Sequence, residues 1–202
     1  MMAEILRTTG EHVMIVGIAV GVAIILGIPI GILCTRNENA ARIALRLIDG
    51  IQTIPSLALF GFLIPVPFIG GIGMRTAIVA LILYSLLPVV RNTFLGIRGV
   101  DPVVRDAGLA LGLTPRQLLT QVELPLAMPT IVAGIRIATV VGIGVATIAA
   151  AVGGGGLGTF IFRGVAMVDT RLILAGALPA AVLALLADVV LSTVERKLVA
   201  EG

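Results

Sequence analysis

Long stretches without charge constrain the fold of this chain more than any other feature. Residues 13–34 form a run of 22 residues with no charged side chain. About 20 helical residues cross the hydrocarbon core of a bilayer, and this run is too long for the core of a cleavable signal peptide. Because only 12% of all residues are charged, against about a quarter in soluble domains, the sequence predicts an integral protein of the lipid bilayer.

Four further segments have the length and apolar character of membrane spans. They cover about residues 47–64, 76–95, 131–152 and 172–194, and Pro55 breaks the first of them. We therefore expect an all-α polytopic protein in which residues 1–202 form a single transmembrane domain of five helices. Two glycine pairs in the first span, Gly17 with Gly21 and Gly27 with Gly31, favour close contact between helices.

The distribution of positive charge predicts the orientation, because cytoplasmic loops are enriched in Lys and Arg. If the loop after the first span is cytoplasmic, ten basic residues lie inside and four outside. The inside set is Arg36, Arg42, Arg46, Arg91, Arg98, Arg105, Arg116, Arg136, Arg196 and Lys197, and the outside set is Arg7, Arg75, Arg163 and Arg171. The N-terminus is then outside and the C-terminus inside. The net charge of +3 is too small and too scattered to indicate nucleic acid binding.

A polar interruption, residues 101–125, separates the third and fourth spans. Its start has the signals of a short helix: Asp101 can cap it, and Pro102 suits the first helical position, where no N–H is needed. Gly112 can end this helix in a left-handed conformation.

A second short helix is predicted immediately afterwards. Thr114 and Gln117 have the spacing of a capping box, and Leu113 and Leu118 that of a hydrophobic staple. In a soluble protein two such helices would suggest a helix-turn-helix that reads DNA. Between membrane spans, the hairpin must instead pack on something at the membrane surface.

The same segment resembles the EAA coupling motif of ABC importer permeases, which reads Glu-Ala-Ala, three residues, Gly, nine residues, then Ile-x-Leu-Pro. Ala107, Gly112, Leu124 and Pro125 match it, while Asp106, Gly108 and Val122 each have one carbon fewer than the motif residue. The resemblance implies that Asp106, Ala107, Gly108, Gly112, Leu113 and Pro125 couple the spans to a cytoplasmic ATPase. We call residues 101–125 the coupling hairpin.

Polar residues surround the proline of the second segment. Polar groups at that depth must be satisfied by other helices or by a water-filled cavity. Two interpretations stay open: a kinked helix that lines a translocation path, or hydrogen bonding between helices alone. The candidate path residues are Gln52, Thr53, Pro55, Ser56 and, from the third segment, Tyr84.

Asp188 lies in the inner half of the last span, where an unpaired carboxylate is costly. We expect a structural ion pair with Arg136 or Arg91, both near the inner ends of their spans. The alternative is a proton-coupling carboxylate, as in an ion-coupled secondary transporter or channel.

The remaining motifs do not indicate an enzyme. Residues 153–158, which read Gly-Gly-Gly-Gly-Leu-Gly, lack the Lys-Ser/Thr pair of a phosphate loop, so we expect an outer turn before a short helix. His12 and Cys34 are at opposite ends of the first span, which argues against a zinc site. No triad or carboxylate pair is evident, and we expect no catalytic residue, metal or cofactor.

Residues 52–65, 83–101 and 153–158 also resemble the osmoprotectant branch of these permeases, which imports glycine betaine, carnitine and choline. The resemblance implies a type I ABC importer in a bacterial or archaeal plasma membrane. Its other parts would be ATPase subunits, a second permease subunit (an identical copy or a homologue) and an external solute-binding protein. Quaternary ammonium groups are bound by aromatic cages, and this chain has no Trp and one Tyr. Selectivity is therefore expected in the binding protein.

Overall fold

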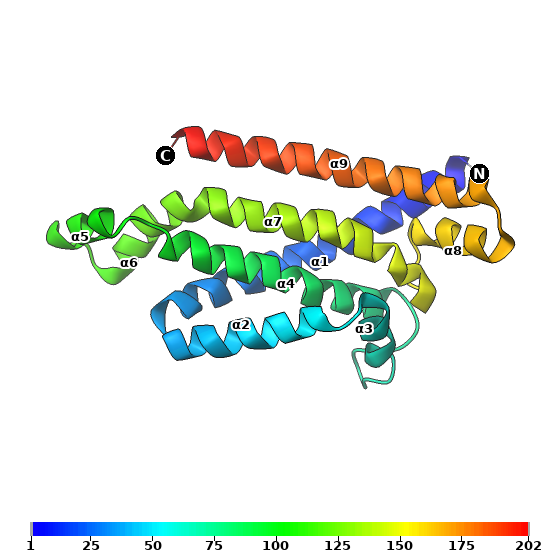
Figure 1. Cartoon of the computed structure of the whole chain (residues 1–202), viewed down its shortest axis with the longest axis horizontal. Coiled ribbons are helices and arrows are strands. Elements are labelled where there is room, and N and C mark those ends of the chain that lie inside the picture. The colour runs from blue at the N-terminus through cyan, green and yellow to red at the C-terminus, as the bar shows by residue number, and fades with distance from the viewer. Residues whose placement is uncertain (1, 202) are drawn as a thin grey trace.

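The computed structural model describes residues 2–201, and over that range it contains only helices and connecting turns. The four longest helices run lengthwise in an elongated bundle (Figure 1): α1 (Met2–Arg36), α4 (Met74–Arg98), α7 (Leu124–Ala146) and α9 (Thr170–Glu201). Among the described residues, four helical stretches are long and apolar enough to cross a membrane, and a bent helix pair raises the number to five. The predicted all-α polytopic fold is confirmed.

The core of the bundle lies where α1, α4 and α7 meet. Ile15 of α1, Leu81 of α4 and Ile143 of α7 belong to one buried cluster. Close packing of these side chains holds the three helices together. By contrast, α9 lies along the outside of α7 and buries few of its own side chains.

One of the two predicted glycine pairs packs helices together. A Cβ atom on Gly27 would stand 2.8 Å from a methyl group of Val89 on α4, and Gly31 is just as tightly enclosed. Gly17 and Gly21 have no neighbouring atom within 4 Å of such a Cβ. Only the pair in the second half of α1 therefore brings two helix backbones close together.

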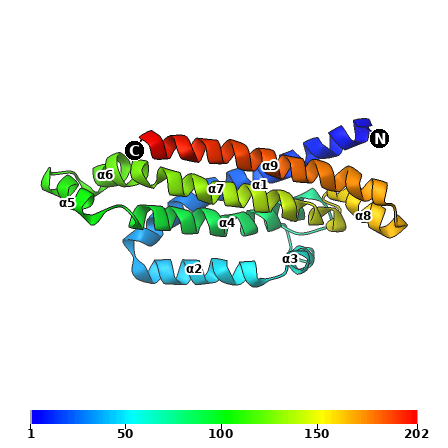
Figure 2. The same ribbon diagram turned by 45° about the horizontal axis from the view of Figure 1, so that its top comes forward.

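The second predicted span is broken at Pro55 as expected, but it bends more sharply and begins earlier than predicted. The chain forms α2 (Glu38–Thr53) and α3 (Ser56–Leu63), with an angle of 100° between them. Ile54 is extended, with φ −71° and ψ 125°, because the ring of Pro55 disfavours helix at the preceding residue. Figure 2 shows α2 alongside α4, with α3 turned across its end.

The fourth segment also differs in its limits from residues 131–152. A continuous helical rod begins with α6 (Pro115–Leu118), passes through a π-helical turn, η1 (Leu119–Glu123), and becomes α7. It ends in a 3₁₀ turn, η2 (Ile148–Val152), after which a glycine-rich turn leads to the short helix α8 (Gly158–Met167). The expected short helix after the glycine run is therefore present.

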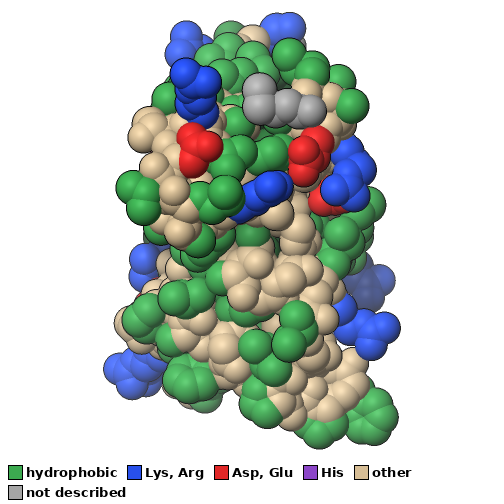
Figure 3. Space-filling model, turned by 90° about the vertical axis from the view of Figure 1, so that its right-hand side faces the viewer, with side chains coloured by type: hydrophobic (Ala, Val, Ile, Leu, Met, Phe, Trp, Pro, Cys, Tyr) green, Lys and Arg blue, Asp and Glu red, His purple; other side chains and the backbone are tan. Residues whose placement is uncertain are grey.

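The two ends of the bundle have different contents. The hairpin end contains α5 (Pro102–Ala110), α6 and the C-terminal end of α9, whereas the N-terminal end contains the start of α1 and α8 (Figure 1). Figure 3 looks onto the N-terminal end. The acidic side chains visible there lie in its upper half, on the side of α9, next to basic ones, and in the lower half, on the side of α3, basic side chains are seen at the edges.

Candidate functional site

The first helix of the coupling hairpin has the expected caps. The Asp101 carboxylate accepts a hydrogen bond from the Val103 N–H at 2.8 Å, and Pro102 begins α5. At the other end Gly112 has φ +84°. Its N–H donates to the Leu109 carbonyl, and the Leu113 N–H donates to the Gly108 carbonyl at 3.2 Å. This pair of bonds is a Schellman motif, which a left-handed glycine makes possible.

The second helix of the hairpin begins with the predicted capping box. The Thr114 N–H donates to the Gln117 side chain at 2.9 Å, and the Gln117 N–H donates to the Thr114 hydroxyl at 3.4 Å. Together these bonds satisfy backbone donors that the short helix leaves free. The turn between α5 and α6 is therefore fixed by local bonds on both sides.

Gly108 lies at the point where the two helices of the hairpin pack together. It is buried, and a Cβ atom there would stand 2.8 Å from Leu118 Cδ1 and 3.3 Å from Leu113 Cδ1. The two staple leucines thus pack over the glycine. This contact explains why glycine suits a position where the motif has alanine. Gly108 and Leu113 shape the hairpin from inside, whereas Asp106, Ala107 and Gly112 are exposed.

The coupling hairpin exposes several large apolar side chains. Val103 is 73% exposed, Leu111 is 85% exposed, and Leu109 is also exposed. Large apolar side chains exposed on a short polar segment favour contact with another protein. Pro125 is exposed too, in the first turn of α7.

Glu123 is a site residue that the sequence analysis missed. It is the last residue of η1, its side chain is 0% exposed, and two arginines contact it. Arg36 Nη2 donates to Oε2 at 2.8 Å, and Arg105 Nη2 lies 2.9 Å from Oε1, at an angle outside hydrogen-bond geometry. The only signal in the sequence was a carboxylate inside the Val-Glu-Leu-Pro end of the motif.

The candidate path residues separate into two groups. The Gln52 amide donates to the Tyr84 carbonyl at 2.8 Å, and the Tyr84 hydroxyl donates to the Ile54 carbonyl. These two hydrogen bonds therefore hold the break between α2 and α3 against α4, and the Tyr84 hydroxyl satisfies the backbone carbonyl of Ile54. Thr53 and Pro55 are exposed, and Ser56 is half-buried.

A cavity of about 260 Å³ lies between α2, α4 and α7. Gln52 lines it together with Pro88, Arg91, Asn92 and residues of α7. The other candidate path residues are not among those that line it. Asn92, an amide within a span, had not been predicted.

The structure brings Asp188 together with Arg136 but not with Arg91. Arg136 Nη1 donates to the Asp188 carboxylate at 3.1 Å, and its Nε lies 3.1 Å from Glu195. Arg91 pairs instead with Asp49 of α2 at 3.2 Å. Of the two candidate partners of Asp188, Arg136 is therefore confirmed, and Arg91 is not a partner because Asp49 of α2 lies beside it.

The glycine-rich turn packs against the first helix. Gly153, Gly155 and Gly156 have positive φ, and the Gly156 N–H donates to the Glu11 carboxylate at 3.3 Å. His12 Nδ1 would lie 3.0 Å from a Cβ on Gly156. The carboxylate of Glu11 therefore satisfies this backbone N–H of the turn.

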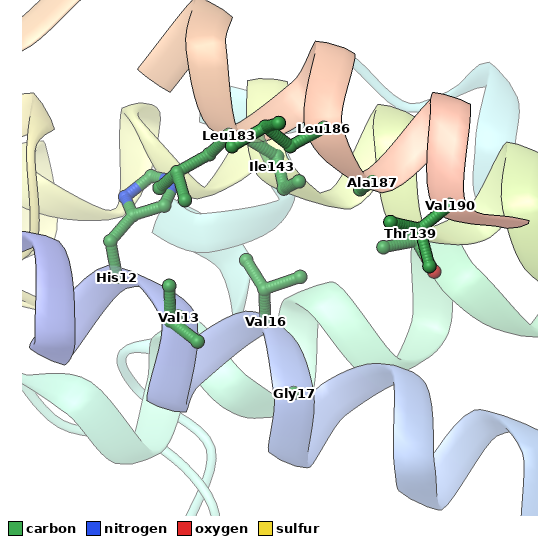
Figure 4. A pocket seen from close by; sticks show the side chains of 10 residues that line it. All are labelled: His12, Val13, Val16, Gly17, Thr139, Ile143, Leu183, Leu186, Ala187 and Val190. Carbon is green, nitrogen blue, oxygen red and sulfur yellow. The ribbon is translucent and has the colours of Figure 1, made fainter. Parts of the chain in front are cut away.

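His12 also lines an open apolar cavity of about 330 Å³ between α1, α7 and α9 (Figure 4). Its Nε2 lies 3.1 Å from the Ile143 carbonyl oxygen, and apart from Thr139 the other lining residues are apolar or glycine. No group of three or more His, Cys, Asp or Glu side chains suited to a metal is found among the described residues.

Comparison with known proteins gives consistent matches. The family model for the binding-protein-dependent transport system inner membrane component matches residues 27–200. The chain is 44% identical over 199 residues to the choline transport system permease protein OpuBB of Bacillus subtilis (strain 168), covering 98% of this chain and 90% of that protein. It is 44% identical over 196 residues to the osmoprotectant import permease protein OsmW of Salmonella typhimurium, covering 96% and 91%.

Solved structures share the fold at low sequence identity. An inward-facing conformation of the MetNI methionine ABC transporter gives a TM-score of 0.88 at 23% identity, covering 98% of this chain and 97% of that chain. A crystal structure of an amino acid ABC transporter with histidines gives 0.81 at 20% identity, covering 97% and 94%.

Proposed function

The chain belongs to the family of binding-protein-dependent transport system inner membrane components, and on this premise we propose that it is the permease subunit of an ATP-driven importer for quaternary ammonium solutes such as glycine betaine, carnitine and choline. The names of the relatives, a choline permease and an osmoprotectant permease, support this solute class. The observation that supports a coupling role most directly is the capped hairpin with its exposed apolar surface.

In this proposal the hairpin end faces the cytoplasm, and ATP is hydrolysed on separate subunits. The bias of ten basic residues against four supports that orientation. Val103, Leu109 and Leu111 then face a cleft of the ATPase, where burial of their exposed side chains stabilises the contact. The external binding protein docks at the opposite, N-terminal end, where Figure 3 shows acidic and basic side chains together.

We assign the solute path to the face where α2, α4 and α7 surround the smaller cavity. Gln52 and Asn92 offer amide groups there, and Thr53 and Ser56 lie at the adjacent helix break. A second permease subunit, identical or homologous, would complete the path on this face. The pairing of Asp188 with Arg136 supports a structural role for that carboxylate over proton coupling.

The test is reconstitution of the chain with its ATPase and binding protein in proteoliposomes. Uptake of labelled glycine betaine, choline or carnitine should require both ATP and the binding protein. Uptake that persists without nucleotide would support an ion-coupled transporter and contradict the proposal.

The docking surface can be tested in the same system. Val103→Asp or Leu111→Asp should abolish copurification of the ATPase, because each places a charge on the apolar contact surface. Phe68→Asp is the matched control: Phe68 is 97% exposed in the loop between α3 and α4, away from the hairpin, so its ATPase should remain bound. Equal binding by all three variants would place the ATPase elsewhere.

A further inference from the structure

Glu123 joins three segments that are distant in the sequence. It closes η1 at the start of α7, Arg36 is the last residue of α1, and Arg105 lies in the middle of α5. One carboxylate oxygen faces each arginine, at 2.8 Å and 2.9 Å. The carboxylate is fully buried, while the arginine side chains are 39% and 33% exposed. The carboxylate at the centre of this cluster is therefore shielded from solvent, whereas the arginines at its edge are partly exposed.

The cluster is a charged side-chain link between the first hairpin helix and the spans. Of residues Pro102–Ala110, only Gly108 is buried, and Gly108 packs mainly on the leucines of the hairpin itself. Arg105 instead reaches the base of α7. A displacement of α5 can therefore reach the spans through this ion pair, through the connecting turn at Gly99 and Val100, or through its packing on α6, which continues into α7.

The charges make this link sensitive to the loss of either partner. A buried carboxylate is stable only when its charge is paired, and removing one partner leaves an uncompensated charge. Glu123 also ends a π-helical turn, a rare geometry that is found frequently at functional sites. A cluster needed only for packing could be replaced by apolar side chains of similar volume without loss.

We propose that Glu123 is a positioning residue for transport: through Arg105 and Arg36 it holds the coupling hairpin to the ends of α1 and α7, so that movement of the hairpin reaches both spans. This inference rests on the proposed function. It assigns to the carboxylate the transmission of the ATPase movement, which is distinct from the docking contact made by the outer apolar surface.

The experiment measures the number of ATP molecules hydrolysed per glycine betaine imported by the full complex in proteoliposomes. Glu123→Gln keeps the shape but loses the charge, and its amide N–H₂ faces one of the arginines. We expect the ratio to rise about tenfold or more, with the ATPase still bound, because the coupling between the two sites is lost. Glu123→Asp keeps the charge and should restore a large part of the coupling.

Glu38→Gln is the matched control. Glu38 also pairs with an arginine near the hairpin end, Arg98 at 3.2 Å, but its side chain is 77% exposed. Its ratio should stay within about twofold of the wild type, since exposed pairs contribute little. If Glu123→Gln does not assemble, Arg105→Gln decides the question, because it leaves the pair of Glu123 with Arg36 in place and breaks only the link to α5.

The outcomes separate this inference from the proposed function. If the assembled wild-type complex imports none of glycine betaine, choline and carnitine, the proposed function fails. If the wild type imports solute and both Glu123→Gln and Arg105→Gln keep its ratio of ATP to solute, the positioning role is overturned. Loss of coupling in Glu123→Gln without any recovery in Glu123→Asp would also overturn it, because the charge would then not be responsible.

Discussion

Gly31 of α1 lies so close to Thr93 of α4 that a Cβ atom on the glycine would stand 2.6 Å from the Thr93 Cβ. The threonine is fully buried, and its hydroxyl donates to the Val89 carbonyl at 2.8 Å. Neither side chain nor backbone has room to move aside. This contact fixes the spacing between α1 and α4 in the half of the bundle nearest the hairpin.

Gly31→Ala should therefore destabilise the protein by about 1–3 kcal/mol, because the added methyl group forces two tightly packed backbones apart. The thermal unfolding midpoint in detergent, followed by circular dichroism, measures this change. Gly21→Ala is the control on the same helix, since a Cβ there meets nothing within 4 Å. Equal midpoints for the two variants would mean that α1 and α4 pack more loosely than the structure has them.

Gly112→Val should uncouple ATP hydrolysis from uptake while the protein still folds. Gly112 has φ +84° and no atom near its missing Cβ, so the substitution acts through backbone strain alone, about 1–3 kcal/mol for a residue held in this region. The measurement is solute uptake per ATP hydrolysed. Gly112→Asn should retain most of the coupling, because asparagine tolerates the left-handed conformation. Normal uptake by a well-expressed Gly112→Val variant would contradict this prediction.

Features set by neighbours in the sequence could be predicted without the structure. The capping roles of Asp101, Gly112 and Thr114 were predicted correctly, because each acts on a backbone group no more than four residues away. The break at Pro55 was expected for the same reason. Its angle was not, because the direction of a broken helix depends on what the two halves pack against.

Contacts between distant segments could not be predicted. Arg36 and Glu123 are 87 positions apart, and a single sequence gives no reason to pair them among 14 basic and 11 acidic residues. Arg91 was one of two candidate partners of Asp188, and it pairs with another carboxylate. Its partner Asp49 lies within the predicted second span, but a single sequence does not show that this part of α2 lies beside Arg91 of α4.

Asp188→Asn should lower the folded yield and change uptake per folded molecule little, because it removes one of the two carboxylates paired with Arg136 near the inner end of a span. Arg136 would also keep Glu195 as a neighbour. Arg136→Gln removes both contacts and should reduce the folded yield more. The measurements are folded yield by size-exclusion chromatography and uptake per folded molecule. A normally folded Asp188→Asn variant whose transport had lost its pH dependence would support proton coupling instead.

Cysteines at Thr53 and Ser56 should react with small water-soluble thiol reagents in the assembled transporter, if the break between α2 and α3 faces a wet path. The background is Cys34→Ala, which removes the only native thiol, itself buried. A control at Leu185 of α9, which is exposed on the outside of the bundle, should stay unreactive because lipid surrounds it. Ile82 is a poorer control, since it packs against the core cluster and would be protected in any case. Added glycine betaine should slow labelling at the path positions alone. Equal protection of Thr53, Ser56 and Leu185 would mean that the break is packed dry, and the path would then have to be sought among other helices.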